Sequence, residues 1–367
     1  MKFTCTQEHL TRGLGHVAAV AGRNSQLPIL EHIQIVLNDG VMQLTATDLQ
    51  IGVSSTVLGK VEEEGECTIL ARKIVGYVQQ LPKTQPIVLD KKGNVLTVST
   101  KGFHAEFPVG DAQEFPALPQ LPTASTITIN ASVLCSALTR TLFAAARDDT
   151  RPEIHSVFVQ CAPEQLVLAA TDSFRLAQEL VTLKSINDNT SLLLPLTTAQ
   201  EVVRLFTDED EVVISLHDSH VTFVAEGVEL SSRLVDGVYP DYKQIIPTEF
   251  SVTGSVDKGE LSRALKTLLV FLSRDSRRVY VAVQPKDGVV VLTTGSGESG
   301  EGRVSVEFDG EGEDLKVLFN IQYILDCLAY IATERVRLQF VGVSEPAVIT
   351  PDIKDSPYIY VVMPIQA

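Results

Sequence analysis

Apolar residues recur along this chain with two different spacings. From Gln7 to Val20 they return every three or four residues, which is the spacing of one face of an α-helix. The same spacing predicts further helices at 71–81, 131–146, 195–206, 258–272 and 320–331. Elsewhere apolar and polar residues alternate in short runs such as Val95–Thr100, which predicts strands joined by tight turns. The chain is therefore predicted to be an α+β protein with antiparallel sheets.

The alternating runs predict sixteen strands. They lie near 29–37, 41–47, 51–58, 86–90, 94–100, 102–108, 157–160, 165–170, 175–181, 212–216, 221–225, 278–284, 289–294, 304–308, 336–341 and 358–363. Antiparallel sheets can leave one face to helices and the other to neighbours.

The whole pattern repeats after 124 residues. Thr47-Asp48 returns as Thr171-Asp172, and Leu10 in the first helical segment returns as Leu134. The second helical segment of each unit begins at Ala71, Pro195 and Asn320, which keeps the same register to within one residue. A period of this length is a whole domain. We expect one small fold, with two helices against antiparallel sheets, to occur three times.

Two linkers separate these domains. Residues 116–122 contain three prolines, and residues 245–249 close the second unit. A chain of 367 residues is longer than one hydrophobic core usually supports. We expect domains at 1–122, 126–248 and 252–367, each of an ordinary size.

The charge balance is acidic, but the charges are not spread evenly. A formal net charge of -16 argues against binding nucleic acid by bulk attraction. Acidic clusters fall in predicted strand connections, whereas basic residues gather on the helical segments and their flanks: His9, Arg12, His16, Arg23, Arg72, Lys73, Arg140, Arg147, Arg204, Lys258, Arg263, Lys266 and Arg274. Two interpretations stay open, a basic surface formed by helices or basic residues scattered over solvent-exposed faces.

No motif indicates an active site. Gly295–Gly300 satisfy GxGxxG, but the residues up to Phe308 alternate as a strand, where a dinucleotide site needs a helix. His217 and His220 fall at a predicted turn without a third ligand. Five scattered cysteines without a CxxC spacing favour reduced thiols over disulfides or zinc. We expect no catalysis, cofactor or metal, no signal peptide or membrane span, and a cytoplasmic location.

Four segments and the triplicated unit resemble the bacterial sliding clamps, the beta subunits of DNA polymerase III. The segments are 171–177 (Thr-Asp-Ser-Phe-Arg-Leu-Ala), 236–242, 319–323 and 360–365, and the resemblance spans the chain. It implies a head-to-tail homodimer that closes a six-domain ring around double-stranded DNA without reading its sequence. The implied role is a processivity factor in DNA replication. The implied partners are the polymerase alpha subunit, the clamp loader, and other polymerases and repair proteins that carry clamp-binding peptides.

The resemblance also implies a partner-peptide groove between the second and third domains. Its wall and floor would be Ile154, Thr171, Ser173, Phe174, Arg175, Leu176, Pro240, Ile245, Val361 and Met363. The adjoining pocket would use Asn320, Tyr323, Ser344, Pro364 and Ile365. Phe174 stands where the family often has histidine, Gln244 where it often has arginine, and Gln366-Ala367 where it often ends in Arg-Leu. We therefore expect a more apolar and less basic groove, while ordinary core packing accounts for part of Leu176 and Val361.

Two further surfaces follow from the resemblance. The DNA-facing candidates are Arg23, Arg72, Arg147 and Arg151. The dimer interface would join Phe271 and Leu272 to Phe103 on an edge strand, and Lys73 to Glu298 or Glu301. Two other functions remain as alternatives, a monomeric scaffold of the same fold that does not encircle DNA and a nucleotide-dependent enzyme using Gly295–Gly300.

Overall fold

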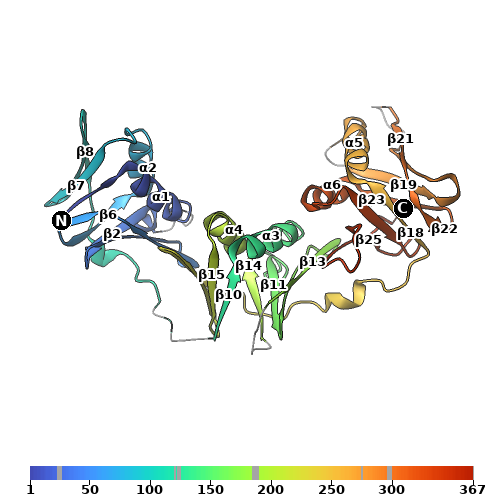
Figure 1. Ribbon diagram of the computed structural model, residues 1–367, viewed down its shortest axis with the longest axis horizontal. Helices are drawn as coiled ribbons and strands as arrows, with labels where there is room; N and C mark the ends of the chain where they lie inside the picture. Colours follow the sequence, from blue (N-terminus) through green and yellow to red (C-terminus); the bar gives the residue numbers. More distant parts are fainter. Residues whose placement is uncertain are drawn as a thin grey trace. The chain divides into compact units, whose positions relative to one another are not determined.

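The computed structural model describes residues 1–22, 27–119, 121, 125–183, 190–273, 276–295 and 300–366 (Figure 1). Across these ranges it contains six α-helices: α1 (Gln7–Ala18), α2 (Ala71–Val78), α3 (Ala131–Leu142), α4 (Leu196–Phe206), α5 (Lys258–Leu268) and α6 (Ile321–Tyr330). All six predicted helices are confirmed, each starting within one residue of its predicted start.

Five helices end earlier than the hydrophobic pattern predicts, and only α4 ends at its predicted residue. The segment after α3 shows why, because Ala144, Ala145 and Ala146 are buried although they lie beyond the helix. After α5 the chain continues as a short 3-10 helix, η4 (Leu269–Phe271). Buried residues in the turn after a helix thus continue its apolar pattern, so the pattern predicts a helix that is too long.

Each helix follows directly on a strand, and all six of these strands are absent from the prediction. They are β1 (Lys2–Thr6), β6 (Gly65–Leu70), β10 (Ser125–Asn130), β14 (Thr190–Pro195), β18 (Val252–Asp257) and β23 (Leu315–Asn320). No turn separates strand from helix, so the usual boundary signal is missing. The last strand residue instead serves as N-cap: Thr6, Asp257 and Asn320 each accept a hydrogen bond from the first helical turn.

The remaining strands follow the alternating pattern closely, with four additional short ones (β5, β17, β22 and β25). Their bounds are β2 (His32–Asn38), β3 (Val41–Thr47), β4 (Ile51–Val57), β5 (Lys60–Glu63), β7 (Pro86–Lys92), β8 (Val95–Thr100), β9 (Phe103–Pro108), β11 (Ser156–Ala162), β12 (Gln165–Thr171), β13 (Arg175–Thr182), β15 (Glu211–Leu216), β16 (His220–Ala225), β17 (Val228–Arg233), β19 (Arg278–Gln284), β20 (Val289–Thr293), β21 (Arg303–Glu307), β22 (Asp309–Gly312), β24 (Arg335–Phe340), β25 (Ala347–Pro351) and β26 (Tyr358–Val362).

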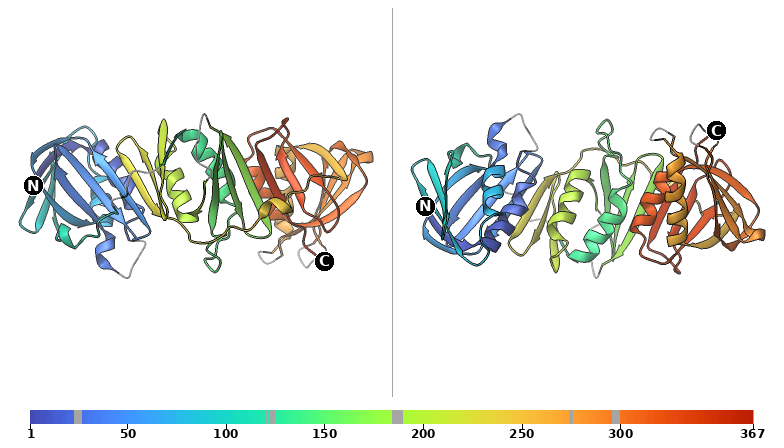
Figure 2. Two further views of the ribbon diagram at one scale, coloured as in Figure 1. Left: turned by 90° about the horizontal axis from the view of Figure 1, so that it is seen from below. Right: turned by 90° about the horizontal axis from the view of Figure 1, so that it is seen from above.

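The described residues form two compact units, and the central repeat contributes to both. The first unit, residues 1–132 and 204–234, holds sheets in the orders β10-β15-β16-β17-β4-β3-β2-β6 and β5-β1-β7-β8-β9. The second, residues 133–203 and 235–367, holds β14-β11-β12-β13-β26-β25-β24-β18-β22 and β21-β20-β19-β23. In the first unit α1 packs on β3 and β4 beside α2; in the second α5 packs on β18 and β20 beside α6 (Figures 1 and 2).

In each unit, one strand pair joins neighbouring repeats. In the first unit β4 pairs antiparallel with β17 and places Gly52 opposite Ser231. In the second, β13 pairs with β26 and places Leu176 opposite Val361. The two pairs occupy equivalent positions in the repeat, so each eight- or nine-stranded sheet crosses a repeat boundary without a break.

Candidate functional site

The segment Thr171–Arg175 forms a tight turn between β12 and β13. Thr171 Oγ1 donates to the carbonyl of Arg175 at 2.6 Å, and Asp172 Oδ1 accepts from the N–H groups of Phe174 and Arg175, both at 3.0 Å. Ser173 takes the left-handed backbone conformation with φ of 76°. Phe174 follows at the tip and is 61% exposed. The polar side chains therefore fix a turn that presents an aromatic ring to solvent.

The first unit contains the same turn at Thr47–Ile51. Thr47 Oγ1 donates to the carbonyl of Ile51 at 2.9 Å, and Asp48 Oδ1 accepts from the N–H groups of Gln50 and Ile51. Leu49, at the position of Ser173, also has φ of 76°. The repeated Thr-Asp pair thus marks a repeated backbone structure, as the 124-residue period predicts.

Apolar side chains from both sides of the β13–β26 pair form one cluster beneath the second turn. The predicted residues Ile154, Leu176 and Val361 all belong to it and are buried. Tyr239 and Tyr242 belong to it as well, and sequence reasoning missed both although they lie in the motif at 236–242. Tyr242 opens the 3-10 helix η3 (Tyr242–Ile245), whose last residue Ile245 is 41% exposed, and Pro240 is exposed just before it.

The C-terminal segment closes the site from the other side. The N–H of Met363 donates to the carbonyl of Phe174 at 2.9 Å, and the N–H of Ile365 donates to the carbonyl of Leu318 on β23 at 2.8 Å. Met363, Pro364 and Ile365 are half-buried. These two hydrogen bonds carry the segment from the turn to β23, the strand that leads into α6.

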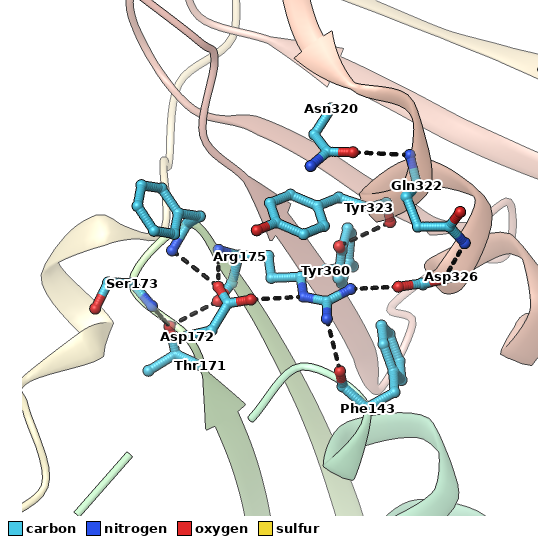
Figure 3. A network of polar contacts seen from close by, with 11 residues as sticks. Phe143, Thr171, Asp172, Ser173, Arg175, Asn320, Gln322, Tyr323, Asp326 and Tyr360 are labelled. Atoms are coloured by element: carbon cyan, nitrogen blue, oxygen red, sulfur yellow. Dashed lines mark hydrogen bonds and ion pairs between the residues drawn. The ribbon is translucent and has the colours of Figure 1, made fainter. Parts of the chain in front are cut away.

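Arg175 lies behind the turn and is 5% exposed. Its Nε donates to Asp172 Oδ2 at 3.0 Å, Nη1 to Asp326 Oδ2 at 2.6 Å and Nη2 to the carbonyl of Phe143 at 2.9 Å (Figure 3). Its guanidinium carbon lies 4.5 Å from the ring centroid of Tyr323. Burial by itself lowers the pKa of Arg175, but Tyr360 and the two carboxylates outweigh it and raise that pKa above its ordinary value. Arg175 therefore stays charged and joins β13 to α6.

The predicted adjoining pocket falls on the start of α6. Asn320 is the N-cap, and its Oδ1 accepts from the N–H of Gln322 at 3.0 Å. Tyr323 is half-buried one turn later, and its carbonyl accepts from Tyr360 Oη at 2.8 Å (Figure 3). Ser344 lies on the β24–β25 connection and is exposed. Sequence reasoning missed Phe143 and Asp326, because no local pattern relates either residue to Arg175.

The four DNA-facing candidates do not share one environment. Arg72 is exposed on α2, and Arg147 and Arg151 are exposed in the connection that follows α3. Arg151 Nη2 donates to Ser173 Oγ at 3.0 Å, which places this arginine beside the Phe174 turn. Arg23 lies outside the described residues. A further basic surface is an open hollow on α5 that is lined by Lys258, Arg263 and Lys266 with Leu328 of α6.

The dimer-interface candidates occur in both units, and two of them lie on or beside an edge strand. Phe103 is 45% exposed on β9, an edge strand as predicted, and Lys73 is exposed on α2. Glu301 is exposed just before the edge strand β21, while Glu298 lies outside the described residues. Leu272 is half-buried after η4. Phe271 is partly engaged within its own chain, because a Cβ on Gly302 would lie 2.8 Å from its ring. Sequence reasoning missed Val270, which is 80% exposed.

Two predictions are confirmed at the motifs set aside in the sequence, a strand after Gly300 and a turn at His217–His220. β20 and β21 pair antiparallel on either side of Gly295–Gly300, so a strand follows this loop instead of a helix. Residues 296–299 lie outside the described residues. His217 and His220 stand at the β15–β16 turn, where the N–H of His217 donates to the carbonyl of His220. Among the described residues, no group of three potential metal ligands gathers, and no helix is long and apolar enough to cross a membrane.

Comparison with known proteins shows which family this chain belongs to. Three domain models of the DNA polymerase III beta subunit match this chain in order: the N-terminal domain at 1–119, the central domain at 128–241 and the C-terminal domain at 243–366. The chain belongs to the DNA polymerase III beta subunit family. The triple α+β fold and the resemblance found in the sequence are thereby confirmed, whereas the predicted boundaries at 122, 126, 248 and 252 stay a prediction.

Individual members of this family match over the full chain. The beta sliding clamp of Synechococcus elongatus is 28% identical over 373 residues, covering 100% of this chain and 99% of that protein. The beta sliding clamp of Staphylococcus aureus is 28% identical, and the match covers 97% of this chain and 97% of that protein. Among solved structures, a Pseudomonas aeruginosa DnaN sliding clamp bound to griselimycin gives a TM-score of 0.95 at 28% identity, with both chains fully covered. The Thermotoga maritima beta subunit gives 0.94 at 30% identity, covering 100% of this chain and 99% of that one.

Proposed function

We propose that this chain is a DNA sliding clamp, a replication processivity factor that works without catalysing a reaction. The observation that carries the proposal is the match of all three beta-subunit domain models in order along the chain. The full-length likeness to the Pseudomonas aeruginosa clamp, at a TM-score of 0.95, supports it. In a bacterial cell this role belongs to the cytoplasm, where replication takes place.

As a clamp, the chain would act as a head-to-tail homodimer whose ring encircles double-stranded DNA. A ring needs no tight or sequence-specific contact, which suits a chain with a net charge of -16. The exposed Arg72 and Arg147 and the basic hollow on α5 supply weak phosphate contacts on an otherwise acidic protein. Arg151 would contribute less, because its guanidinium already donates to Ser173.

Partner proteins would bind at the Phe174 turn through short peptides with apolar anchors. The supporting observation is an exposed ring, Phe174, above a buried apolar cluster, with half-buried Met363, Pro364 and Ile365 beside it. An apolar anchor needs such a preformed surface, and nearby polar groups can orient the peptide backbone. The partners we propose are the polymerase alpha subunit, the clamp loader, and other polymerases and repair proteins with clamp-binding peptides.

Retention on DNA tests the ring. The protein would be loaded onto nicked circular plasmid with a bacterial clamp loader and ATP, and the plasmid would then be cut once. A ring stays on the circle and leaves the linear form by sliding off its ends. Equal loss from both forms, with a known clamp as a working control, would contradict encirclement and favour a non-encircling scaffold of the same fold.

Peptide affinity tests the groove. The variant Met363→Ala with Pro364→Ala should weaken binding of a fluorescein-labelled hexapeptide with two leucines and a terminal phenylalanine by roughly 10- to 100-fold, the scale of truncated hot-spot side chains. Fluorescence anisotropy measures the affinity, and the Pseudomonas aeruginosa clamp checks that the probe is competent. Leu58→Ala, a substitution at a 62% exposed side chain of the first unit, is the matched control. Unchanged affinity in the double variant would exclude this position for the groove.

A further inference from the structure

Arg175 connects the two parts of the proposed groove, and one helix carboxylate holds it from the far side. We propose that Asp326 is a positioning residue for partner-peptide binding, which acts by fixing Arg175 between Phe174 and Tyr323. This inference rests on the proposed function, because it assigns a role within the same peptide groove. It adds a residue that the sequence does not associate with the groove.

Asp326 is itself held firmly. Its Oδ1 accepts from Gln322 Nε2 at 2.7 Å, and its Oδ2 accepts from Arg175 Nη1 at 2.6 Å (Figure 3). The side chain of Asp326 is 22% exposed, so water competes little for these bonds. Gln322 is one turn earlier on α6, and it is tied in turn to Arg277, whose Nη1 donates to Gln322 Oε1 at 3.0 Å. The carboxylate is therefore oriented by the helix and orients the guanidinium.

Tyr323 and Asp326 approach the same guanidinium from α6. They are three residues apart, and side chains at that spacing lie on the same face of a helix. The ring of Tyr323 lies 4.5 Å from the guanidinium carbon, a distance at which a cation attracts an aromatic face. While Asp326 fixes Nη1, the guanidinium stays against the tyrosine ring. The position of Tyr323 thus depends on Asp326 through Arg175.

Asp172 holds the opposite side of Arg175 and cannot replace Asp326. Its Oδ2 already accepts from Arg175 Nε, and its Oδ1 already accepts from two backbone N–H groups of the turn, one of them that of Phe174. Loss of Asp326 would leave Nη1 of a buried cation without its partner. We expect the guanidinium then to turn away from Tyr323. The part of the groove around Phe174 and the part around Tyr323 would then no longer be held in fixed positions relative to each other.

Two substitutions at Asp326 test the proposal directly. Asp326→Ala should lower the affinity for the labelled hexapeptide about tenfold, as loss of one well-placed interaction can do. Asp326→Asn should weaken it less, because the amide keeps one acceptor but turns an N–H toward Arg175 or Gln322. The control is Asp352→Asn, which removes a carboxylate that accepts from Arg337 Nη2 at 2.8 Å on the same unit and should leave affinity unchanged. Full affinity in both Asp326 variants would overturn the proposal.

A double-mutant cycle separates positioning from general stability. If Asp326 acts through Arg175, adding Asp326→Ala to Arg175→Met should change peptide affinity by less than about twofold. Each variant is checked for an intact dimer by light scattering. If Asp326→Ala alone folds poorly, the double variant still serves as a test, because Arg175→Met removes the buried positive charge that Asp326→Ala leaves unpaired. Fully additive losses would contradict the mechanism. The Met363→Ala with Pro364→Ala variant shows whether the groove itself is wrongly placed. If the groove is wrong, this variant keeps full affinity; if only the role of Asp326 is wrong, this variant still loses affinity.

Discussion

His16 on α1 is a residue whose charge depends on folding. Its ring is half-buried, with Nδ1 3.0 Å from Ser55 Oγ. Burial, and then the positive charges of Arg12 and Arg204, lower its pKa from 6.5 to about 4. Arg204 contributes because its guanidinium donates to the carbonyls of Gly15 and His16 at 3.0 and 2.7 Å. Arg204, which contacts the last turn of α1, therefore adds to the effect of burial in favouring neutral His16.

This lowered pKa predicts an acid-sensitive fold. Between pH 6.5 and 4 the unfolded chain binds a proton at His16 and the folded chain does not, so stability falls as pH falls through this window and is unaffected by His16 above it. In His16→Gln the melting temperature should depend less steeply on pH between 6.5 and 4.5. Differential scanning fluorimetry measures this, with His9→Gln, an exposed histidine on the same helix, as control. Equal slopes in wild type and His16→Gln would refute it.

The repeated element is the Thr-Asp turn with the strand pair that follows it, yet its two copies differ in side chains. At the first junction the N–H of Arg233 donates to the carbonyl of Gln50, just as that of Met363 donates to Phe174 at the second. However, Gly52 and Ser231 stand where the second junction has Leu176 and Val361. Leu118 from the proline-rich linker packs onto Gly52 instead. The backbone of the site thus occurs twice and its apolar lining once.

The close fit at Gly52 gives a prediction for this element. A Cβ there would lie 2.3 Å from Leu118 Cδ2, so Gly52→Ala should destabilise the protein by about 1–3 kcal/mol, the usual cost of overpacking. Adding Leu118→Ala should recover part of that loss by removing the obstructing side chain. Urea unfolding midpoints measure both. Gly76→Ala is the control: nothing lies within 4 Å of its Cβ on α2, and alanine there should stabilise by about 0.5–1 kcal/mol. A neutral Gly52→Ala would show that the linker yields freely.

Sequence patterns predict the elements better than the contacts between them. Periodicity locates all six helices and the repeat, because each helix buries one face within its own domain. It misses β1 and the other strands that run straight into helices, because no turn residue marks those boundaries. At the site, the repeated Thr-Asp pair points to the Phe174 turn. Asp326 reaches that site only through tertiary packing, so spacing along the chain carries no sign of it. Tyr242 lies in the motif at 236–242, but only the packing shows that its ring is buried beneath the turn.

At the scale of the whole molecule, the acidic charge and the proposed ring depend on each other. With a net charge of -16 and few basic side chains near the DNA, binding without encirclement should be weak. A closed ring escapes this limit because it must open, or reach a DNA end, to leave. Retention on circular plasmid should therefore depend on dimer closure far more than on any one basic side chain.

Breaking the proposed dimer interface tests this dependence. Lys73→Glu puts a negative charge opposite the region of Glu301, and Leu272→Ala removes half-buried apolar area after η4, so together they should give monomers by light scattering. The monomers should lose retention on circular plasmid yet bind the labelled hexapeptide with unchanged affinity, because the Phe174 turn lies within one chain. Lys354→Glu with Val343→Ala makes a comparable change at exposed positions outside the candidate interface and should remain dimeric. A dimer that survives Lys73→Glu with Leu272→Ala would place the interface elsewhere, while monomers that stay on the circle would contradict encirclement itself.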